Sequence, residues 1–210
     1  MKKTILAALL FIASLKAFCG VVDHDRMYQA YLTNDMSVWK TELQKYTAST
    51  DLTITDKLEI SNYLYGYIAT LLTDANKNKQ EIISWIELWE KYLEEIEKTT
   101  GKNAYVHVYR SSINAYKSKV KAGGMMVWGP RSLTELKRAL NIDPNNPLAN
   151  GLKGNILFYM PGFVGGDKEE SIKWFEKALA GVAASTDKTF RWNRCAITLC
   201  LAQAYEKTGN

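Results

Sequence analysis

The sequence predicts an all-α protein built from antiparallel helix pairs. Between residues 79 and 98, apolar residues fall at alternating steps of four and three, which places them on one face of a long helix. Polar or Gly/Pro-containing turns separate this segment from similar ones, and no segment alternates with the period of two that is typical of a strand. A chain of 210 residues that is 47% hydrophobic and 23% charged is large enough to form a real core.

The helical segments can be placed in order along the chain from their spacing and their end signals. Asp35 and Asp167 are predicted N-caps, and Gly101 is a predicted C-terminal stop. Residues 121–132, with three Gly and a Pro, are expected to interrupt the helices. The expected helices are 24–33, 35–47, 55–73, 79–98, 103–120, 131–141, 147–159, 167–181 and 188–208.

Residues 1–19 have the features of a secretory signal peptide. Two lysines begin the chain, an apolar run of 12 residues follows at 4–15, and small residues then permit cleavage before Gly20. A membrane-spanning helix needs about 20 residues, so this run is too short to be one. The alternative is a lipoprotein anchored through Cys19, which Phe18 disfavours because a small residue normally precedes the modified cysteine. We therefore expect an exported protein, periplasmic or secreted.

Export changes both the charge and the cysteine content. Removing Lys2, Lys3 and Lys16 lowers the Lys and Arg total from 27 to 24 against 22 acidic residues, so the net charge falls from +5 to near +2. This weak charge argues against nucleic acid or an anionic membrane as a partner. Cys195 and Cys200 remain, five apart on a predicted helix, with Cα atoms about 8–9 Å apart. That exceeds the reach of a disulfide, and we expect both to be small buried apolar side chains.

Residues 131–210 resemble the tetratricopeptide repeat family. The motif DPNNP breaks the chain between two helix pairs, and small residues fall where paired helices approach closely: Gly154, Ala178, Ala139 and Ser171. Phe175 matches the aromatic wedge of the repeat, and Tyr65-Gly66 repeats a pairing of a bulky residue with glycine. More narrowly, the chain resembles exported bacterial members of the family that carry a P-x-x-x-G-G-D insert. Corresponding helices recur at about 45 residues, and the family unit is 34.

This resemblance implies one domain over residues 20–210, folded as a right-handed α-solenoid that ends in an unpaired first helix. First helices would line a concave face. Asn155 matches one position of the site with which some family members bind a peptide's C-terminal carboxylate. The lysine expected four residues earlier is Gly151 here, so we do not predict this binding mode. The candidate concave-face residues are Tyr63, Tyr67, His107, Arg110, Asn114, Asn155 and Tyr159.

Two apolar inserts, at 121–132 and 160–166, would join the helices within successive pairs and lie along the same edge of the array. We favour a lid packed on the helical core, with Trp128 and Phe163 in one apolar cluster, because buried Met and aromatic residues usually serve packing. The alternative is an exposed binding lip. The candidate lip residues are Met125, Met126, Trp128, Met160 and Phe163.

The sequence contains no recognisable catalytic, metal or phosphate-binding motif, and neither His24 nor His107 has partners at a metal-ligand spacing. We therefore expect no enzyme activity, cofactor or metal. The first functional hypothesis is a scaffold that binds a protein or peptide. The alternative is an accessory protein of the cell envelope that binds a glycan or another solute on its aromatic concave face.

The last predicted helix carries more apolar residues than one neighbouring pair can cover. Either the natural chain continues beyond Asn210 and covers them, or the open end docks onto a partner or a second copy.

Overall fold

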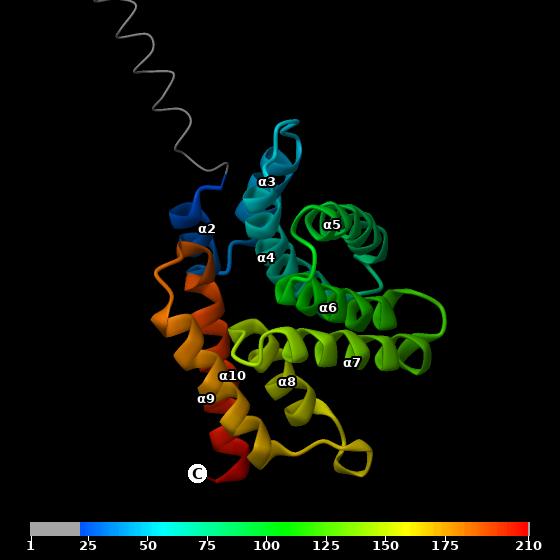
Figure 1. The fold of residues 1–210 in the computed structure, drawn as a ribbon, viewed down its shortest axis with the longest axis vertical. Helices are drawn as coiled ribbons and strands as arrows, with labels where there is room; N and C mark the ends of the chain where they lie inside the picture. Colours follow the sequence, from blue (N-terminus) through cyan, green and yellow to red (C-terminus); the bar gives the residue numbers. More distant parts are fainter. Residues whose placement is uncertain (1–21, 210) are drawn as a thin grey trace, which may run out of the picture.

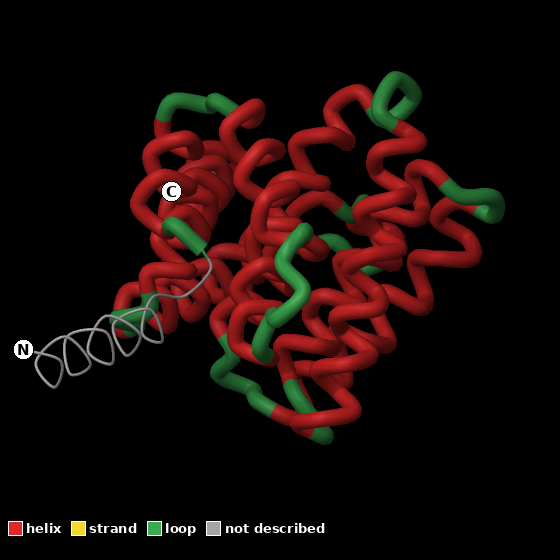
Figure 2. The backbone as a smooth tube through the Cα atoms, turned by 90° about the horizontal axis from the view of Figure 1, so that it is seen from above, coloured by secondary structure: helices red, strands yellow, loops and turns green. Residues whose placement is uncertain are grey.

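The computed structural model describes residues 22–209, and within that range the chain is all-α, as predicted (Figures 1 and 2). The predicted signal peptide at 1–19 lies outside the described residues. Short 3₁₀ turns at Leu72–Asp74, Gly162–Val164 and Lys188–Phe190 accompany the α-helices. These helices are α2 (His24–Leu32), α3 (Met36–Thr47), α4 (Ile54–Leu71), α5 (Lys79–Thr100), α6 (Ala104–Val120), α7 (Gly124–Ile142), α8 (Pro147–Tyr159), α9 (Lys168–Ala184) and α10 (Arg191–Thr208).

The predicted helix ends are mostly confirmed. Asp35 accepts hydrogen bonds from the backbone N–H groups of Ser37 and Val38, and Asp167 accepts one at 2.9 Å from the N–H of Glu170. Gly101 follows α5 with a φ of 68°, a conformation that favours glycine. The residues predicted to start or stop these helices therefore do so through the expected hydrogen bonds and backbone conformation.

The largest local error concerns the insert at 121–132. We expected a loop there, but α7 begins at Gly124 and runs through Pro130. Gly123, at a φ of 86°, makes the turn from α6 in place of a longer loop. Pro130 removes one helical hydrogen bond, and the helix continues past it because a proline can kink a helix without ending it.

The helices pack mostly as sequential antiparallel pairs, and the α8–α9 pair has the predicted small-residue contacts. A Cβ added to Gly154 would lie 2.7 Å from the Phe175 ring, so only glycine allows this approach. Ser171 and Ala178 of the same pair are fully buried, and so is Ala139 of α7.

The last described helix, α10, contacts helices from two parts of the chain. It packs against α9, and it also lies beside α2, the first described helix (Figure 1). The Asn62 side chain of α4 donates hydrogen bonds to the Thr189 carbonyl (2.8 Å) and to Asn193 Oδ1 of α10 (2.7 Å). These contacts hold the first half of α10 against α2 and α4.

The core divides into one large apolar cluster, formed by α2 to α8 with Trp192, and two small ones under α9 and α10. The small clusters centre on Phe175 and on Ala178 with Ile197. No helix among residues 22–209 is long and apolar enough to span a bilayer.

Candidate functional site

The main candidate site, which we call the aromatic cleft, is a cavity of about 430 Å³ where the three apolar clusters meet. Helices α2, α3, α4, α8, α9 and α10 all contribute to it, so it depends on the packing of the first described helices against the last one. Its volume falls within the range of small-molecule sites, about 300–1,000 Å³. The lining residues are Tyr31, Asn34, Met36, Trp39, Tyr65, Gly66, Ala69, Thr70, Thr73, Leu148, Gly151, Leu152, Asn155, Phe175, Trp192, Asn193, Ala196, Ile197 and Cys200.

Two tryptophans from distant parts of the chain meet at the cleft over Gly66. A Cβ added to Gly66 would lie 2.7 Å from Trp39 and 2.9 Å from Trp192, so a side chain there would separate the two rings. Tyr31 contacts both tryptophans, with ring centroids 6.0 and 5.7 Å away, and Tyr65 lies 5.9 Å from Trp192. Trp39 is fully buried and Trp192 nearly so, and the aromatic surface within reach of a bound ring is therefore mainly that of the half-buried Tyr31 and Tyr65.

Polar groups in the cleft are few, and two of them are unsatisfied. The Nε1 donor of Trp192 and the Oδ1 acceptor of Asn155 are buried without a hydrogen-bond partner among the described residues. Such atoms are costly unless a ligand or water completes them. No lining residue of the cleft carries a charged side chain. The site is therefore suited to an apolar ligand that carries few polar groups.

The titratable groups of the cleft are neutral at physiological pH. Burial raises the pKa of Tyr65 to about 12, and it also raises the pKa of Tyr31 and that of the Cys200 thiol. The phenols and the thiol thus stay protonated, which makes them poor metal ligands and poor nucleophiles. Cys195 and Cys200 are both free, as predicted, but they are half-buried and not buried.

Of the predicted concave-face residues, only Asn155 lines the aromatic cleft. Tyr63 and Tyr67 point into the core, where Tyr63 shares a hydrogen bond with His24 (2.8 Å) and Tyr67 donates one to Glu81 (2.8 Å). The spacing of apolar residues in α4 indicates that these positions face a neighbouring helix. It does not distinguish a solvent-accessible concave face from a packed core.

The predicted residues of α6 lie outside the aromatic cleft, and two of them contact carboxylates. His107 Nδ1 lies 2.7 Å from Glu135, and Arg110 pairs with Glu97 through two hydrogen bonds. Arg110 and Asn114 line a small polar cavity of about 120 Å³ between α5, α6 and α7. These contacts are explained by helix packing and provide no ligand site of useful size.

The lip residues are on the surface, so the lid interpretation is wrong. Met126 and Phe163 are each 90% exposed, which excludes the predicted apolar cluster of Phe163 with Trp128. Trp128 instead packs against Lys117 and Arg131, whose cationic groups lie 5.0 and 4.8 Å from its ring. Met125 and Tyr159 are also exposed, and Met160 is half-buried.

The residues that sequence reasoning missed are the aromatic ones of the cleft, above all Trp39 and Trp192. One signal for them was present, because Tyr65-Gly66 repeats the bulky-then-glycine pairing of the α8–α9 repeat. In the structure, this glycine marks where Trp39 and Trp192 approach α4. No cluster of His, Cys, Asp or Glu among residues 22–209 could hold a metal ion.

Comparison with known proteins gives one informative similarity. No protein-family model matches the sequence, and no curated protein matches it either, so membership in the tetratricopeptide family is limited to the resemblance described above. Among solved structures, the fold is similar to that of the HusA haemophore from Porphyromonas gingivalis, with a TM-score of 0.66 and 19% sequence identity. The alignment covers 87% of this chain and 92% of that one. At this identity, the likeness establishes a shared fold.

Proposed function

We propose that this protein binds a flat apolar ring ligand of the tetrapyrrole class, such as haem, in the aromatic cleft. The observation that carries the proposal is the cleft itself, about 430 Å³ in volume, aromatic and free of charged lining side chains. The similarity in fold to the HusA haemophore supports the choice of ligand class. The proposal replaces the protein-binding scaffold as the main hypothesis and agrees with the small-ligand alternative.

The composition of the cleft favours a ring over a glycan. A sugar presents many hydroxyl groups that need hydrogen-bond partners, and several polar groups of the lining already have partners within the protein, among them Thr70, Thr73 and Asn193. A tetrapyrrole ring instead buries a large apolar face against the half-buried rings of Tyr31 and Tyr65, which Trp39 and Trp192 support from behind. Such burial is worth about 25 cal/mol per Å² of apolar area before the costs of association.

Packing of the ring, and not ligation of its iron, is expected to supply the affinity. Both described histidines are engaged outside the cleft, His24 with Tyr63 and Glu59, and His107 with Glu135. The cleft side chains that could approach an iron are Tyr31, Met36, Tyr65 and Cys200. Because burial keeps the phenols and the thiol protonated, these groups do not favour an anionic axial ligand.

A variant that fills the mouth of the cleft tests the proposal. Ala69 lines the cleft but is exposed, so Ala69→Trp obstructs the opening without disturbing the core. Ala202→Trp, at an exposed position of α10 outside the cleft, is the matched control. We expect haemin to quench tryptophan fluorescence of the wild type and of the control, and Ala69→Trp to bind at least about tenfold more weakly, a loss of about 1.4 kcal/mol.

Equal binding by all three proteins would overturn the cleft as the site. Quenching by neutral oligosaccharides in place of haemin would favour the glycan alternative.

Contact with a protein or peptide is a second candidate function, at a different surface. Its basis is the exposure of Met126 and Phe163, since large apolar side chains exposed to this degree commonly mark contact sites. Capture of a peptide partner by the wild type but not by a Met126→Ser/Phe163→Ser variant would support it. We also propose that the chain is exported and that its helix pairs form a right-handed superhelix of the tetratricopeptide type. The signal-peptide features of residues 1–19 and the repeat resemblance of residues 131–210 support these two points.

A further inference from the structure

A second cavity lies next to the aromatic cleft and shares two lining residues with it. We call it the arginine groove; it lies between α2 and α10 and has a volume of about 670 Å³. Tyr31 and Asn34 line both cavities, so the groove is next to the cleft and within reach of the edge of a ligand seated there. The lining residues of the groove are Tyr28, Tyr31, Leu32, Asn34, Arg191, Arg194, Cys195, Thr198 and Leu199.

The two cavities differ in charge. The cleft has no charged lining side chain, whereas the groove has two arginines and no acidic residue among its lining residues. Arg191 and Arg194 are three residues apart on α10, which places them on neighbouring turns of the same side of the helix. A ligand that spans both cavities would therefore carry its apolar part in the cleft and its negative charge in the groove.

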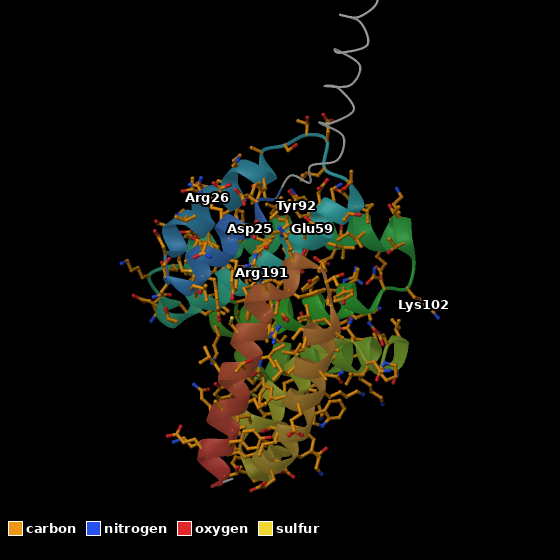
Figure 3. The ribbon with its side chains drawn as sticks, turned by 90° about the vertical axis from the view of Figure 1, so that its left-hand side faces the viewer. Asp25, Arg26, Glu59, Tyr92, Lys102 and Arg191 are labelled. Carbon is orange, nitrogen blue, oxygen red and sulfur yellow. The ribbon has the colours of Figure 1, made fainter. Side chains whose placement is uncertain are left out.

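The two arginines are not equivalent. Arg191 forms an ion pair with Asp25 of α2, and its guanidinium lies 4.1 Å from the centre of the Tyr28 ring; Figure 3 shows Asp25 and Arg191 next to each other. Lys188 pairs with Asp25 as well, at 3.2 Å. Arg194 is exposed and pairs with no carboxylate in the described part of the chain. Arg194 is thus the cation that is available to a ligand.

We infer that Arg194 binds a carboxylate at the edge of the ring held in the aromatic cleft, with Arg191 adding to the positive field. This inference rests on the proposed function and narrows the ligand to a ring that carries acidic side chains. A guanidinium donates two parallel hydrogen bonds to a carboxylate, a geometry that a lysine cannot reproduce. Arg194 is a specificity-determining residue in this arrangement, because it separates acidic tetrapyrroles from neutral ones of the same ring shape.

The experiment compares protoporphyrin, which has two carboxylates, with its dimethyl ester, which has the same ring and no charge. Both are titrated into the wild type, Arg194→Gln and the control Arg138→Gln, an exposed arginine of α7 that pairs with Glu135 away from both cavities. We expect Arg194→Gln to bind the diacid about three- to tenfold more weakly and the ester unchanged. Added salt should weaken diacid binding to the wild type more than to Arg194→Gln.

The possible outcomes distinguish a wrong assignment of Arg194 from a failure of the proposed tetrapyrrole binding. If Arg194→Gln loses affinity for diacid and ester alike, or for neither, the assignment of Arg194 is wrong even though a tetrapyrrole binds. If the wild type binds neither compound, the proposed function itself fails. An Arg194→Glu variant that binds the diacid as well as the wild type does would also overturn the assignment, because it reverses the charge at that position.

Discussion

Trp39 of α3 and Trp192 of α10 pack edge to face at the aromatic cleft, with 5.5 Å between their ring centroids and an angle of 82° between their planes. This arrangement is one that aromatic pairs prefer. It connects helices from opposite ends of the chain, and the absence of a side chain at Gly66 makes room for it. The shape of the cleft thus depends on three residues that come from α3, α4 and α10.

The first prediction concerns Gly66. The substitution Gly66→Ala should improve the intrinsic helix propensity of α4 by about 1 kcal/mol. The added methyl group would nevertheless lie within 3.0 Å of both tryptophans, and overpacking of this kind costs about 1–3 kcal/mol. We expect net destabilisation in urea unfolding together with weaker haemin binding. Gly162→Ala, where nothing lies within 4 Å of the new Cβ, should be near neutral.

The second prediction concerns the buried amide that joins α4 to α10. Asn62→Ala removes two hydrogen bonds and leaves the Thr189 carbonyl and Asn193 Oδ1 without this donor. A lost buried donor costs about 1–3 kcal/mol, so the free energy of unfolding should fall by that amount. Asn145→Ala, in the exposed DPNNP turn, serves as the control and should change stability by less than about 0.5 kcal/mol.

The third prediction concerns the surface inserts. Met126→Ser and Phe163→Ser, alone or combined, should leave the melting temperature and haemin affinity close to those of the wild type, because both side chains are already in solvent. Met27→Ser, at a fully buried methionine of α2, should instead cost about 2–5 kcal/mol. A large loss of stability in the Met126 or Phe163 variant would mean that the inserts do cover the core.

The fourth prediction concerns acid sensitivity. Burial raises the pKa of Glu81, but hydrogen bonds from Lys40, Tyr67 and Trp85 outweigh this effect and hold the pKa below its ordinary value of 4.5. The unfolded chain therefore takes up the proton at a higher pH than the folded one. The stabilisation is present above about pH 4.5 and is lost as the pH falls through the folded pKa.

Urea unfolding at a series of pH values between about 5 and 3 measures this effect. The stability of the wild type should fall over this window more steeply than that of Glu81→Gln. Glu206→Gln, on the exposed surface of α10, controls for the change in net charge. Parallel curves for Glu81→Gln and the wild type would contradict the prediction.

The fifth prediction follows from the neutral side chains of the cleft. Metal-free protoporphyrin and haemin should bind with dissociation constants within about threefold of each other, a difference of less than about 1 kcal/mol. The variants Met36→Leu and Cys200→Ser should retain haemin binding, since neither supplies an essential iron ligand. A haemin absorption spectrum that changes on substitution of one of these residues would identify that residue as a ligand.

The local structure of this protein is readable from its sequence to a large extent. The spacing of apolar residues predicts the helices, Asp35 and Asp167 predict their starts, and the close approach of Gly154 to Phe175 is confirmed. These features depend on residues near one another in the chain. The error at α7 arose from treating Gly129-Pro130 as a helix break, where the helix continues past both residues.

The site was harder to predict because it depends on contacts between distant segments. Tyr63, Tyr65 and Tyr67 stand within one turn of each other on α4, yet only Tyr65 reaches the cleft. Periodicity separates their faces but does not reveal that α10 returns to pack near Tyr65 and Trp39. Our choice of Tyr63 and Tyr67 assumed an open array, in which the last helix would lie far from the first.

The contact of α2 with α10 bears on how the molecule comes apart. In a linear array of repeats, each unit touches only its neighbours, so such arrays can fray from either end. Here Asp25 pairs with Lys188 and Arg191, and Tyr28 lies 3.6 Å from the Cys195 sulfur, so the terminal helices hold each other in place. Neither α2 nor the first turns of α10 can loosen without breaking these bonds. Loss of structure in the first described helix should therefore be coupled to loss of structure at the start of the last one, and hydrogen exchange should slow in both together.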